Sequence, residues 1–228
     1  MLNVAIIPAR GGSKGITKKN LRKINGKSLL QRAIESAKIQ NIHKIIVSTD
    51  SISIKKEALK FGAEVPFIRP IRYSDDHASS EDVLKHAIVE YEKISKIKIS
   101  YIVFLEPTSP FRSKKHVNEA LERIKNNDFN SVLSICQLKR KPENIFVKSN
   151  GLKRYIIEPK NKFIRRQDMT NLCRLNSAIY VIKRDVFLKN NTFVVDPVGW
   201  VEMNEIESIN IDTLTDLRIA RILSKEIE

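Results

Sequence analysis

The chain opens with a short apolar run that leads straight into a glycine-rich, basic loop. Residues 4–7 read Val-Ala-Ile-Ile, a pattern typical of a strand buried on both faces of a sheet. Pro8 cannot donate a hydrogen bond to a neighbouring strand, so we expect regular pairing to end there. The opening therefore predicts a buried first strand whose carboxyl end meets a loop with unusual backbone freedom.

That loop combines glycine and positive charge at high density. Three of the seven glycines and four cations fall within residues 10–19: Gly11, Gly12, Gly15, Arg10, Lys14, Lys18 and Lys19. Glycine allows backbone N–H groups to approach a ligand closely, and clustered cations neutralise phosphate. The alternative is a turn with solvated basic side chains, but the density favours a polyphosphate site. The spacing matches neither G-x-x-x-x-G-K-[ST] nor G-x-G-x-x-G.

Helical and strand patterns alternate along the rest of the chain. We expect helices at residues 29–39, 53–61, 81–94 and 116–126, with a final helix that ends near 224. We expect strands at residues 43–50, 64–68, 101–105 and 131–138, with a last strand from residue 206. This alternation predicts one α/β domain over residues 1–228, built on a doubly wound, mostly parallel sheet. Ligands bind beyond the carboxyl ends of such strands, where the first loop, Asp50 and Arg69 would meet.

Residues 139–175 break this order. The segment is basic, contains proline and asparagine, and has weak periodicity, so we expect a small arm inserted into the α/β domain.

Composition bounds the classes of partner. The net charge of +15 raises nucleic acid as a partner, but the lysines are scattered and no aromatic residues alternate with them, so we expect no specific nucleic-acid binding. No apolar run approaches the roughly 20 residues that span a bilayer. The chain opens straight into a strand, with no signal peptide, and its two cysteines, Cys136 and Cys173, suit buried thiols. A cytoplasmic protein is the expectation.

The stretch IIPARGGSKGITKKN, residues 6–20, resembles the nucleotide-binding signature of the acylneuraminate cytidylyltransferase family. Matches at residues 48–50 (STD), 105–112 (LEPTSPFR) and 211–213 (IDT) extend the resemblance over nearly the whole chain. The resemblance implies a Rossmann-like nucleotidyltransferase that couples CTP to a nine-carbon α-keto sugar acid, giving a CMP-sugar and pyrophosphate. It also implies a Mg²⁺ cofactor and a homodimer in which the arm at 139–175 completes the partner's sugar site.

The resemblance assigns residues to roles in this sequence. It implies catalytic roles for Arg10, Lys19 and Asp212. It places the nucleotide against Arg10, Gly11, Gly12, Ser13, Asn20, Arg69 and Ser80. It places the sugar against Glu106, Arg166, Gln167, Asn176, Tyr180 and Phe193. Ser80 has a second interpretation, as the N-cap of the helix that follows it.

Asn210 and Asp212 occupy the position of the family's metal motif. Alternate residues of an extended strand point the same way, so the two side chains share a face. Carboxylate and carbonyl oxygens suit Mg²⁺, which keeps waters and binds substrate phosphates. Asp212 is the principal ligand expected, with Asn210 offering a neutral carbonyl oxygen. A helix N-cap is the alternative role for Asp212.

Four positions depart from the family's pattern. Asn210 stands where an aspartate is usual, Glu106 where a glutamine is common, and Ser177 where glycine is usual. Asn144 stands where a lysine often follows a proline region. Because an ionised glutamate only accepts hydrogen bonds, whereas glutamine also donates them, Glu106 bears on which sugar acid is used.

Several functions remain open at this stage. The leading hypothesis is attack by the anomeric hydroxyl of a sialic, legionaminic or pseudaminic acid on the α-phosphorus of CTP. The first alternative is a nucleotidyltransferase of the same fold with another base or a Kdo-type acid. The second is a nucleotide- or nucleic-acid-binding protein without turnover. No side chain stands out as a general base.

Overall fold

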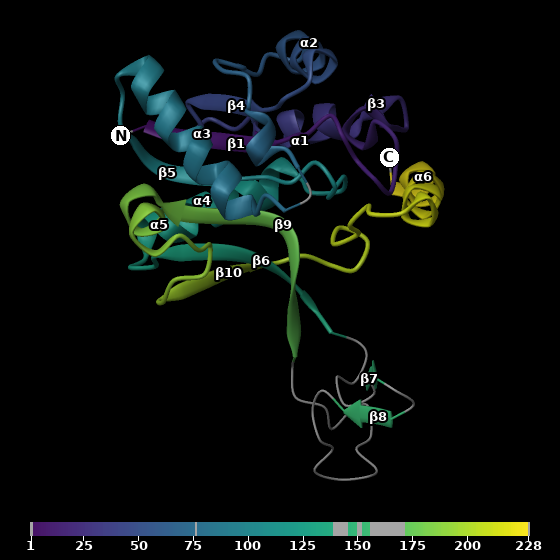
Figure 1. The fold of residues 1–228 in the computed structure, drawn as a ribbon. Coiled ribbons are helices and arrows are strands. Elements are labelled where there is room, and N and C mark those ends of the chain that lie inside the picture. The colour runs from purple at the N-terminus through teal and green to yellow at the C-terminus, as the bar shows by residue number, and fades with distance from the viewer. Residues whose placement is uncertain (1, 76, 139–145, 150–151, 156–171, 228) are drawn as a thin grey trace.

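The computed structural model describes residues 2–75, 77–138, 146–149, 152–155 and 172–227. Within them, a six-stranded sheet has the order β10-β6-β9-β5-β1-β4 (Figure 1). Its strands are β1 (Leu2–Pro8), β4 (Lys44–Ser48), β5 (Ile99–Phe104), β6 (Ser131–Gln137), β9 (Cys173–Lys183) and β10 (Val198–Glu202). β1 pairs in parallel with β4 and β5, and β10 pairs in parallel with β6. Only β9 is antiparallel to its neighbours among these strands. The predicted α/β fold with a mostly parallel sheet is confirmed.

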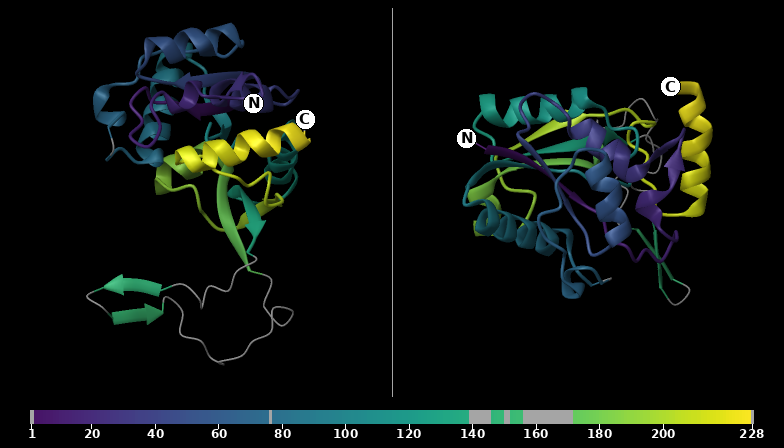
Figure 2. Two further views of the ribbon diagram at one scale, coloured as in Figure 1. Left: turned by 90° about the vertical axis from the view of Figure 1, so that its right-hand side faces the viewer. Right: turned by 90° about the horizontal axis from the view of Figure 1, so that it is seen from above.

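Helices cover both faces of the sheet (Figure 2). α1 (Leu29–Ala37), α2 (Ile52–Lys60) and α4 (Lys114–Asn126) pack on one face, and α3 (Ser80–Ser95) and α5 (Arg184–Asn190) pack on the other. Successive side chains of β1 point to opposite faces of the sheet, which explains why helices cover both faces. Ala5 and Ile7 join one core cluster, while Val4 and Ile6 join the other. All four side chains are fully buried, as expected for a central parallel strand.

A third, smaller apolar cluster holds the C-terminal segment against the N-terminal one. α6 (Leu214–Ile227) packs beside the short strands β2 (Lys23–Ile24) and β3 (Lys27–Ser28) (Figure 2). Ile16, Ile24 and Ile211 are buried in this cluster. The remaining described elements are the 3₁₀ helices η1 (Lys19–Leu21) and η2 (Ile71–Tyr73) and the hairpin strands β7 (Phe146–Ser149) and β8 (Leu152–Tyr155). The cluster places the segment around residue 212 next to the basic loop.

Helix termini follow local capping chemistry, with one prediction corrected. Ser28 caps α1 by accepting from the backbone N–H of Gln31, as its position predicts. Ser79, rather than Ser80, caps α3, because its hydroxyl accepts from the N–H of Asp82. The N-cap interpretation of Ser80 is therefore wrong.

The start of α6 shows which residue caps there. Thr213 Oγ1 accepts from the N–H of Asp216, and the Asp216 carboxylate accepts from the N–H of Thr213. This reciprocal pair has the form of a capping box. The Asp212 side chain accepts from Lys19 and Asn210 instead, so capping is the role of Thr213.

Two predicted strands do not form. The expected strand at 64–68 makes only an isolated bridge between Glu64 and Ile46, because Pro66 has no N–H to continue a ladder. The expected last strand from residue 206 is a turn followed by an extended loop, in which the N–H of Ile209 donates to the carbonyl of Ile206. Ile211 makes one backbone hydrogen bond, to the carbonyl of Thr108, and buries its side chain in the third cluster.

Two strands of the six-stranded sheet, β9 and β10, were not expected, and neither were the short pairs β2–β3 and β7–β8. β9 begins within the predicted arm, so Cys173 to Leu175 belong to the main sheet. Most of residues 139–175 lies outside the described residues, and the arm remains a prediction. Cys136 is buried as expected, whereas Cys173, at the start of β9, is exposed. No helix of the described residues is long and apolar enough to cross a bilayer.

Candidate active site

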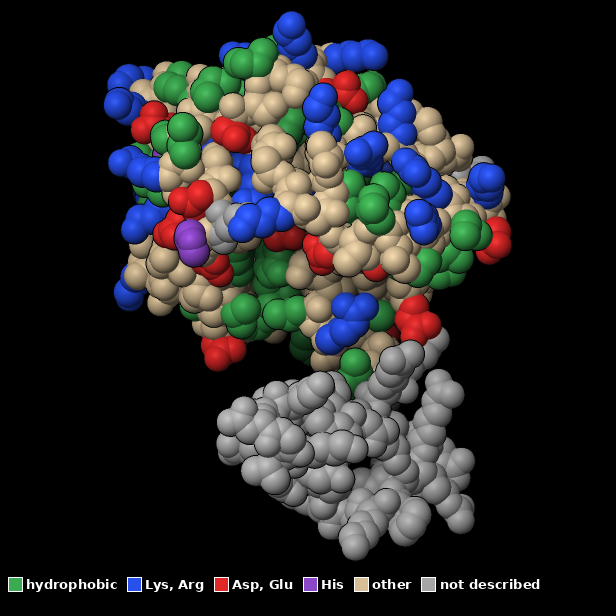
Figure 3. Space-filling view, turned by 45° about the vertical axis from the view of Figure 1, so that its right-hand side comes forward, with side chains coloured by type: hydrophobic (Ala, Val, Ile, Leu, Met, Phe, Trp, Pro, Cys, Tyr) green, Lys and Arg blue, Asp and Glu red, His purple; other side chains and the backbone are tan. Residues whose placement is uncertain are grey.

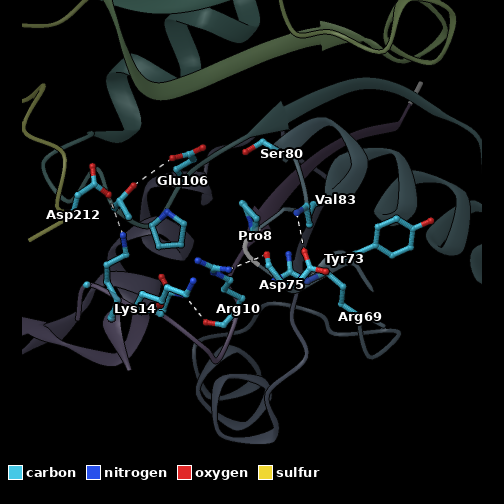
Figure 4. Close-up of a pocket in the computed structure, with 17 residues that line it drawn as sticks. Pro8, Arg10, Lys14, Arg69, Tyr73, Asp75, Ser80, Val83, Glu106 and Asp212 are labelled. Atoms are coloured by element: carbon cyan, nitrogen blue, oxygen red, sulfur yellow. Dashed lines mark hydrogen bonds and ion pairs between the residues drawn. The ribbon is translucent and has the colours of Figure 1, made fainter. Parts of the chain in front are cut away.

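A cavity of about 400 Å³ opens beyond the carboxyl ends of β1 and β5 (Figure 4). It is lined by Pro8, Arg10, Ser13, Lys14, Gly15, Lys19, Asn20, Arg69, Tyr73, Asp75, Ala78, Ser80, Val83, Glu106, Pro107, Thr108 and Asp212. Four stretches far apart in the chain contribute: the end of β1 with the basic loop, residues 69–83, the loop after β5 and the loop before α6. The position agrees with the rule that α/β sheets bind ligands beyond the ends of their strands.

Buried polar contacts shape the basic loop. Asn20 is only 5% exposed, and its amide donates to the backbone carbonyl of Arg10 at 3.0 Å. The N–H of Gly11 donates to the Asp50 carboxylate at 2.8 Å. The start of the loop is thus tied to η1 through Asn20 and to the residues after β4 through Asp50. The Arg10 side chain points across the cavity and donates to the carbonyl of Asp75 at 2.9 Å (Figure 4).

The loop before α6 meets the basic loop at Lys19. The Lys19 ammonium lies 3.1 Å from the Asp212 carboxylate and 3.1 Å from the carbonyl oxygen of Ile211. Asn210 donates from its amide nitrogen to the other Asp212 oxygen at 2.8 Å. The two metal-motif side chains therefore do share a side, although their segment is a loop and not a strand. Lys19 and Asp212 are separated by 193 residues in the chain.

Arg69 and Ser80 lie at the other end of the cavity. Arg69 is 3% exposed, and its Nε donates to the Ser74 hydroxyl. Burial lowers the pKa of its guanidinium to about 10, while the Asp50 carboxylate opposes that shift. Even so, the group is cationic at neutral pH. Because Ser79 provides the cap of α3, the Ser80 hydroxyl is not needed at the helix terminus and lines the cavity instead.

Glu106 brings a carboxylate to the cavity wall near Asp212. Burial raises the pKa of its carboxyl group, and the Asp212 carboxylate acts in the same direction. The hydroxyl of Thr108 donates to it at 3.4 Å. Its backbone is held from below by Arg112, which donates to the carbonyls of Glu106 and Ala178. Burial lowers the pKa of Arg112 to about 9.

The structure brings eight of the predicted residues together around the cavity. They are Arg10, Ser13, Lys19, Asn20, Arg69, Ser80, Glu106 and Asp212. Gly11 and Gly12 adjoin these residues in the chain, and Asn210 hydrogen bonds to Asp212, but none of the three lines the cavity. Arg166, Gln167 and Asn144 lie outside the described residues, so their predicted roles keep the status of predictions.

Three predicted sugar contacts lie outside the cavity wall. The Asn176 side chain is 2% exposed and hydrogen bonds to the hydroxyls of Ser134 and Ser208. This network joins β6, β9 and the turn before the metal motif. Tyr180 and Phe193 stack with ring centroids 4.7 Å apart in the core cluster beside α5. Ser177 adopts a φ of 59°, which accounts for the usual glycine at this position.

Some cavity residues were not singled out from the sequence. Tyr73, Asp75, Ala78, Val83 and Thr108 line it alongside the predicted residues. All but Val83 lie in the two polar loops that carry Arg69 and Glu106. Their closeness in the chain to these predicted residues could have identified them as cavity residues. Val83 sits one helical turn after Ser80, and helical spacing alone would have placed it on the same side of α3.

A Mg²⁺ ion fits this set of donors. The Lys19 ammonium is itself a cation held by the Asp212 carboxylate and a backbone carbonyl, which are hard oxygen ligands. The Asn210 Oδ1 atom is buried and accepts no hydrogen bond from the described residues. No group of three acidic, histidine or cysteine side chains that could hold a metal lies within the described part of the chain. Such a site suits an ion that also needs substrate phosphates.

The surface carries its charge in a dispersed form. Lys and Arg side chains lie at many places on the face in Figure 3, with acidic, hydrophobic and other side chains among them. The expectation that the charge of +15 does not mark a specific nucleic-acid partner stays a prediction.

A sequence profile described as "Cytidylyltransferase" matches residues 4–210. The chain belongs to the cytidylyltransferase family. It is 31% identical over 227 residues to a pseudaminic acid cytidylyltransferase of Campylobacter jejuni, covering 99% of this chain and 97% of that protein. It is 31% identical over 224 residues to a CMP-N,N'-diacetyllegionaminic acid synthase of Legionella pneumophila, covering 93% and 92%. The predicted family and the nucleotidyltransferase class of enzyme are confirmed.

The fold of this family is seen in a solved structure. A CMP:2-keto-3-deoxy-manno-octonic acid synthetase complexed with CTP superposes with a TM-score of 0.73 at 19% identity, covering all of both chains. At this identity the similarity establishes the cytidylyltransferase fold and nothing finer.

Proposed function

We propose that this cytidylyltransferase transfers the CMP group of CTP to the anomeric hydroxyl of a nonulosonic acid. The observation that carries the proposal is the meeting of Lys19 and Asp212 at one end of a cavity that holds Arg69 and Ser80 at the other. Cations suit a triphosphate, and the buried Arg69 guanidinium together with the Ser80 hydroxyl on the cavity wall suits the polar edge of a base. Two relatives of nearly the same length are named for different nonulosonic acids, which supports this substrate class.

In the proposed reaction the anomeric oxygen attacks the α-phosphorus of CTP. A new oxygen–phosphorus bond forms, the bond from the α-phosphorus to the bridging oxygen breaks, and pyrophosphate leaves. The hydroxyl proton passes to solvent or to a phosphate oxygen. Arg10 and Lys19 would neutralise the charge that develops on the phosphates, and the tied backbone of the basic loop would fix their position.

Mg²⁺ would be held by Asp212, with Asn210 beside it. When bound, the ion supplies charge neutralisation on phosphate oxygens. The Asp212 carboxylate lies near enough to Glu106 to help raise the pKa of the Glu106 carboxyl group, so Glu106 faces the same end of the substrate. Its position fits a group that receives a hydroxyl or a cationic group of the sugar.

The assembly and cellular location form part of the proposal. We expect a homodimer in which Arg166 and Gln167 of the arm reach the partner's sugar site. Because CTP is a cytoplasmic metabolite, we expect the reaction in the cytoplasm. Light scattering of the active protein tests the dimer, and an active monomer at assay concentration would refute it.

The function is tested by pyrophosphate release. The protein is incubated with each of CTP, UTP, ATP and GTP against a panel of pseudaminic, legionaminic, sialic and Kdo acids, and products are identified by mass. We expect turnover with CTP and a nonulosonic acid. Preference for Kdo would support the alternative substrate, and no release with any pair would leave a binding protein without turnover.

A further inference from the structure

Both carboxylate oxygens of Asp212 are already occupied by donors of the protein itself. Lys19 Nζ lies 3.1 Å from Oδ1, and Asn210 Nδ2 donates to Oδ2 at 2.8 Å. Lys19 Nζ also donates to the Ile211 carbonyl at 3.1 Å. The ammonium therefore sits on the oxygens that a divalent cation would use, and the two cations cannot share this place because like charges repel at short range.

We infer that Lys19 is an internal cation that closes the metal site of the free protein and leaves it when a nucleotide triphosphate arrives. The inference rests on the proposed function, since it needs a triphosphate beside the basic loop. A triphosphate offers the ammonium more negative charge than one carboxylate does. Once Lys19 turns to the phosphates, the Asp212 oxygen is open to Mg²⁺, and the binding of nucleotide and of metal become coupled.

The exposure of the pair makes such an exchange feasible. The Asp212 side chain is 64% exposed and that of Lys19 is 19% exposed. Water screens an ion pair of this kind, so breaking it costs little compared with a buried pair. Lys19 thus lies close enough to occupy the site and is held weakly enough to leave it.

Asn210 can change its role in the same exchange. Its Nδ2 donates to Asp212 while its Oδ1 is buried without a hydrogen-bond donor among the described residues. A half-turn of the amide exchanges these two atoms without changing the shape of the side chain. That half-turn would point the acceptor Oδ1 toward the site in place of the donor Nδ2. A cation that arrives at the site would favour this orientation of the amide.

The test measures metal binding by the full-length protein without nucleotide. Mn²⁺ serves as the probe, and free Mn²⁺ is followed by electron paramagnetic resonance. Lys19→Met keeps the length of the side chain and removes its charge. We expect it to bind Mn²⁺ about threefold to tenfold more tightly than the parent protein, because the competing cation is gone. Lys19→Gln should show the same direction, which covers the case in which one variant folds poorly.

Lys18→Met is the matched control. Lys18 is the preceding residue and is exposed, and its replacement by methionine removes the same unit of charge. The ammonium that contacts Asp212 is that of Lys19, not that of Lys18. Lys18→Met should change Mn²⁺ affinity by less than about twofold, because solvent and salt screen more distant charges. Adding Asp212→Asn to Lys19→Met should abolish the gain.

The inference is overturned if Lys19→Met binds Mn²⁺ no more tightly than Lys18→Met, or if none of these variants binds Mn²⁺ measurably. Because no nucleotide or sugar acid enters this experiment, it separates the inference from the proposed function. Tighter binding in a protein that turns over no sugar acid would uphold the internal cation and refute the reaction.

Discussion

A β-carbon on Gly15 would lie 2.6 Å from the backbone carbonyl oxygen of Asp212. Real β-carbons do not approach a backbone atom so closely, so any larger residue at position 15 must displace the loop before α6. The basic loop and the loop before α6 are thus in van der Waals contact at Gly15, where only glycine fits. This contact reinforces the one made by Lys19.

Gly15→Ala should therefore damage activity by moving Asp212. Displacing a packed loop costs roughly 1–3 kcal/mol of stability. A shift of about 1 Å at the reacting centre lowers turnover by about 10- to 100-fold. Turnover and thermal unfolding measure the two effects. Gly12→Ala is the control for stability, because no atom lies within 4 Å of the added carbon, and it should unfold like the parent protein.

Lys19→Ala should lower turnover while the fold is kept. The loss of one charged contact to phosphate amounts to roughly 2–4 kcal/mol in the transition state, or about 30- to 1,000-fold in rate. Lys19 is partly exposed and its ion pair with Asp212 is screened, so unfolding should change little. Steady-state kinetics with a circular dichroism melt would decide, and near-parental turnover in a folded variant would contradict the phosphate assignment.

Ser79 and Ser80 should separate stability from nucleotide binding. Ser79→Ala removes the cap of α3 and should cost about 1 kcal/mol of unfolding free energy, with KM for CTP unchanged. Ser80→Ala should leave stability unchanged and raise KM for CTP by about two- to tenfold, the effect of one neutral hydrogen bond. Equal effects of the two changes on KM would contradict the placement of Ser80 against the nucleotide.

Glu106→Gln should stabilise the protein at neutral pH in the absence of divalent cations. The pKa of the Glu106 carboxyl is raised in the folded state by burial. Between the unfolded and folded pKa values the folded protein binds more protons, so stability falls as pH rises through this range. A neutral amide avoids that loss. Chemical denaturation should show an advantage for Glu106→Gln at pH 7 that disappears below the ordinary carboxyl pKa.

Glu106 and Asn210 should also be coupled in catalysis. Both Glu106 and Asn210 lie near Asp212. Glu106 adds a carboxylate and Asn210 lacks one, so the total charge at this end of the cavity matches that of a Gln–Asp pair. Glu106→Gln should therefore lower kcat/KM, and adding Asn210→Asp should recover part of the loss. A double-mutant cycle should give a coupling of roughly 0.5–3 kcal/mol. Independent effects across a Mg²⁺ titration would show that the two positions vary separately.

Local patterns carried much of the fold. The apolar run of β1, the helical spacing of α1 and the Ser28 cap were all readable, because each depends on residues a few positions apart. The strand at 64–68 was predicted from β-branched residues, but Pro66 and the edge position leave only one bridge. β10 escaped prediction because five residues that include Gly199 become a strand only through pairing with β6.

The sequence by itself determined the family, the basic loop and the chemistry of its side chains, since glycine, charge and capping act locally. Only the tertiary structure decided what those side chains meet. Lys19 and Asp212 are 193 residues apart, and no periodicity reports their distance of 3.1 Å. That contact depends on the small apolar cluster that packs α6 beside β2, a long-range burial of Ile16, Ile24 and Ile211. Other long-range contacts bury Asn176, between Ser134 and Ser208, and Phe193, in the core cluster beside α5. Spacing along the chain does not report these contacts, because the partners come together only in the folded protein.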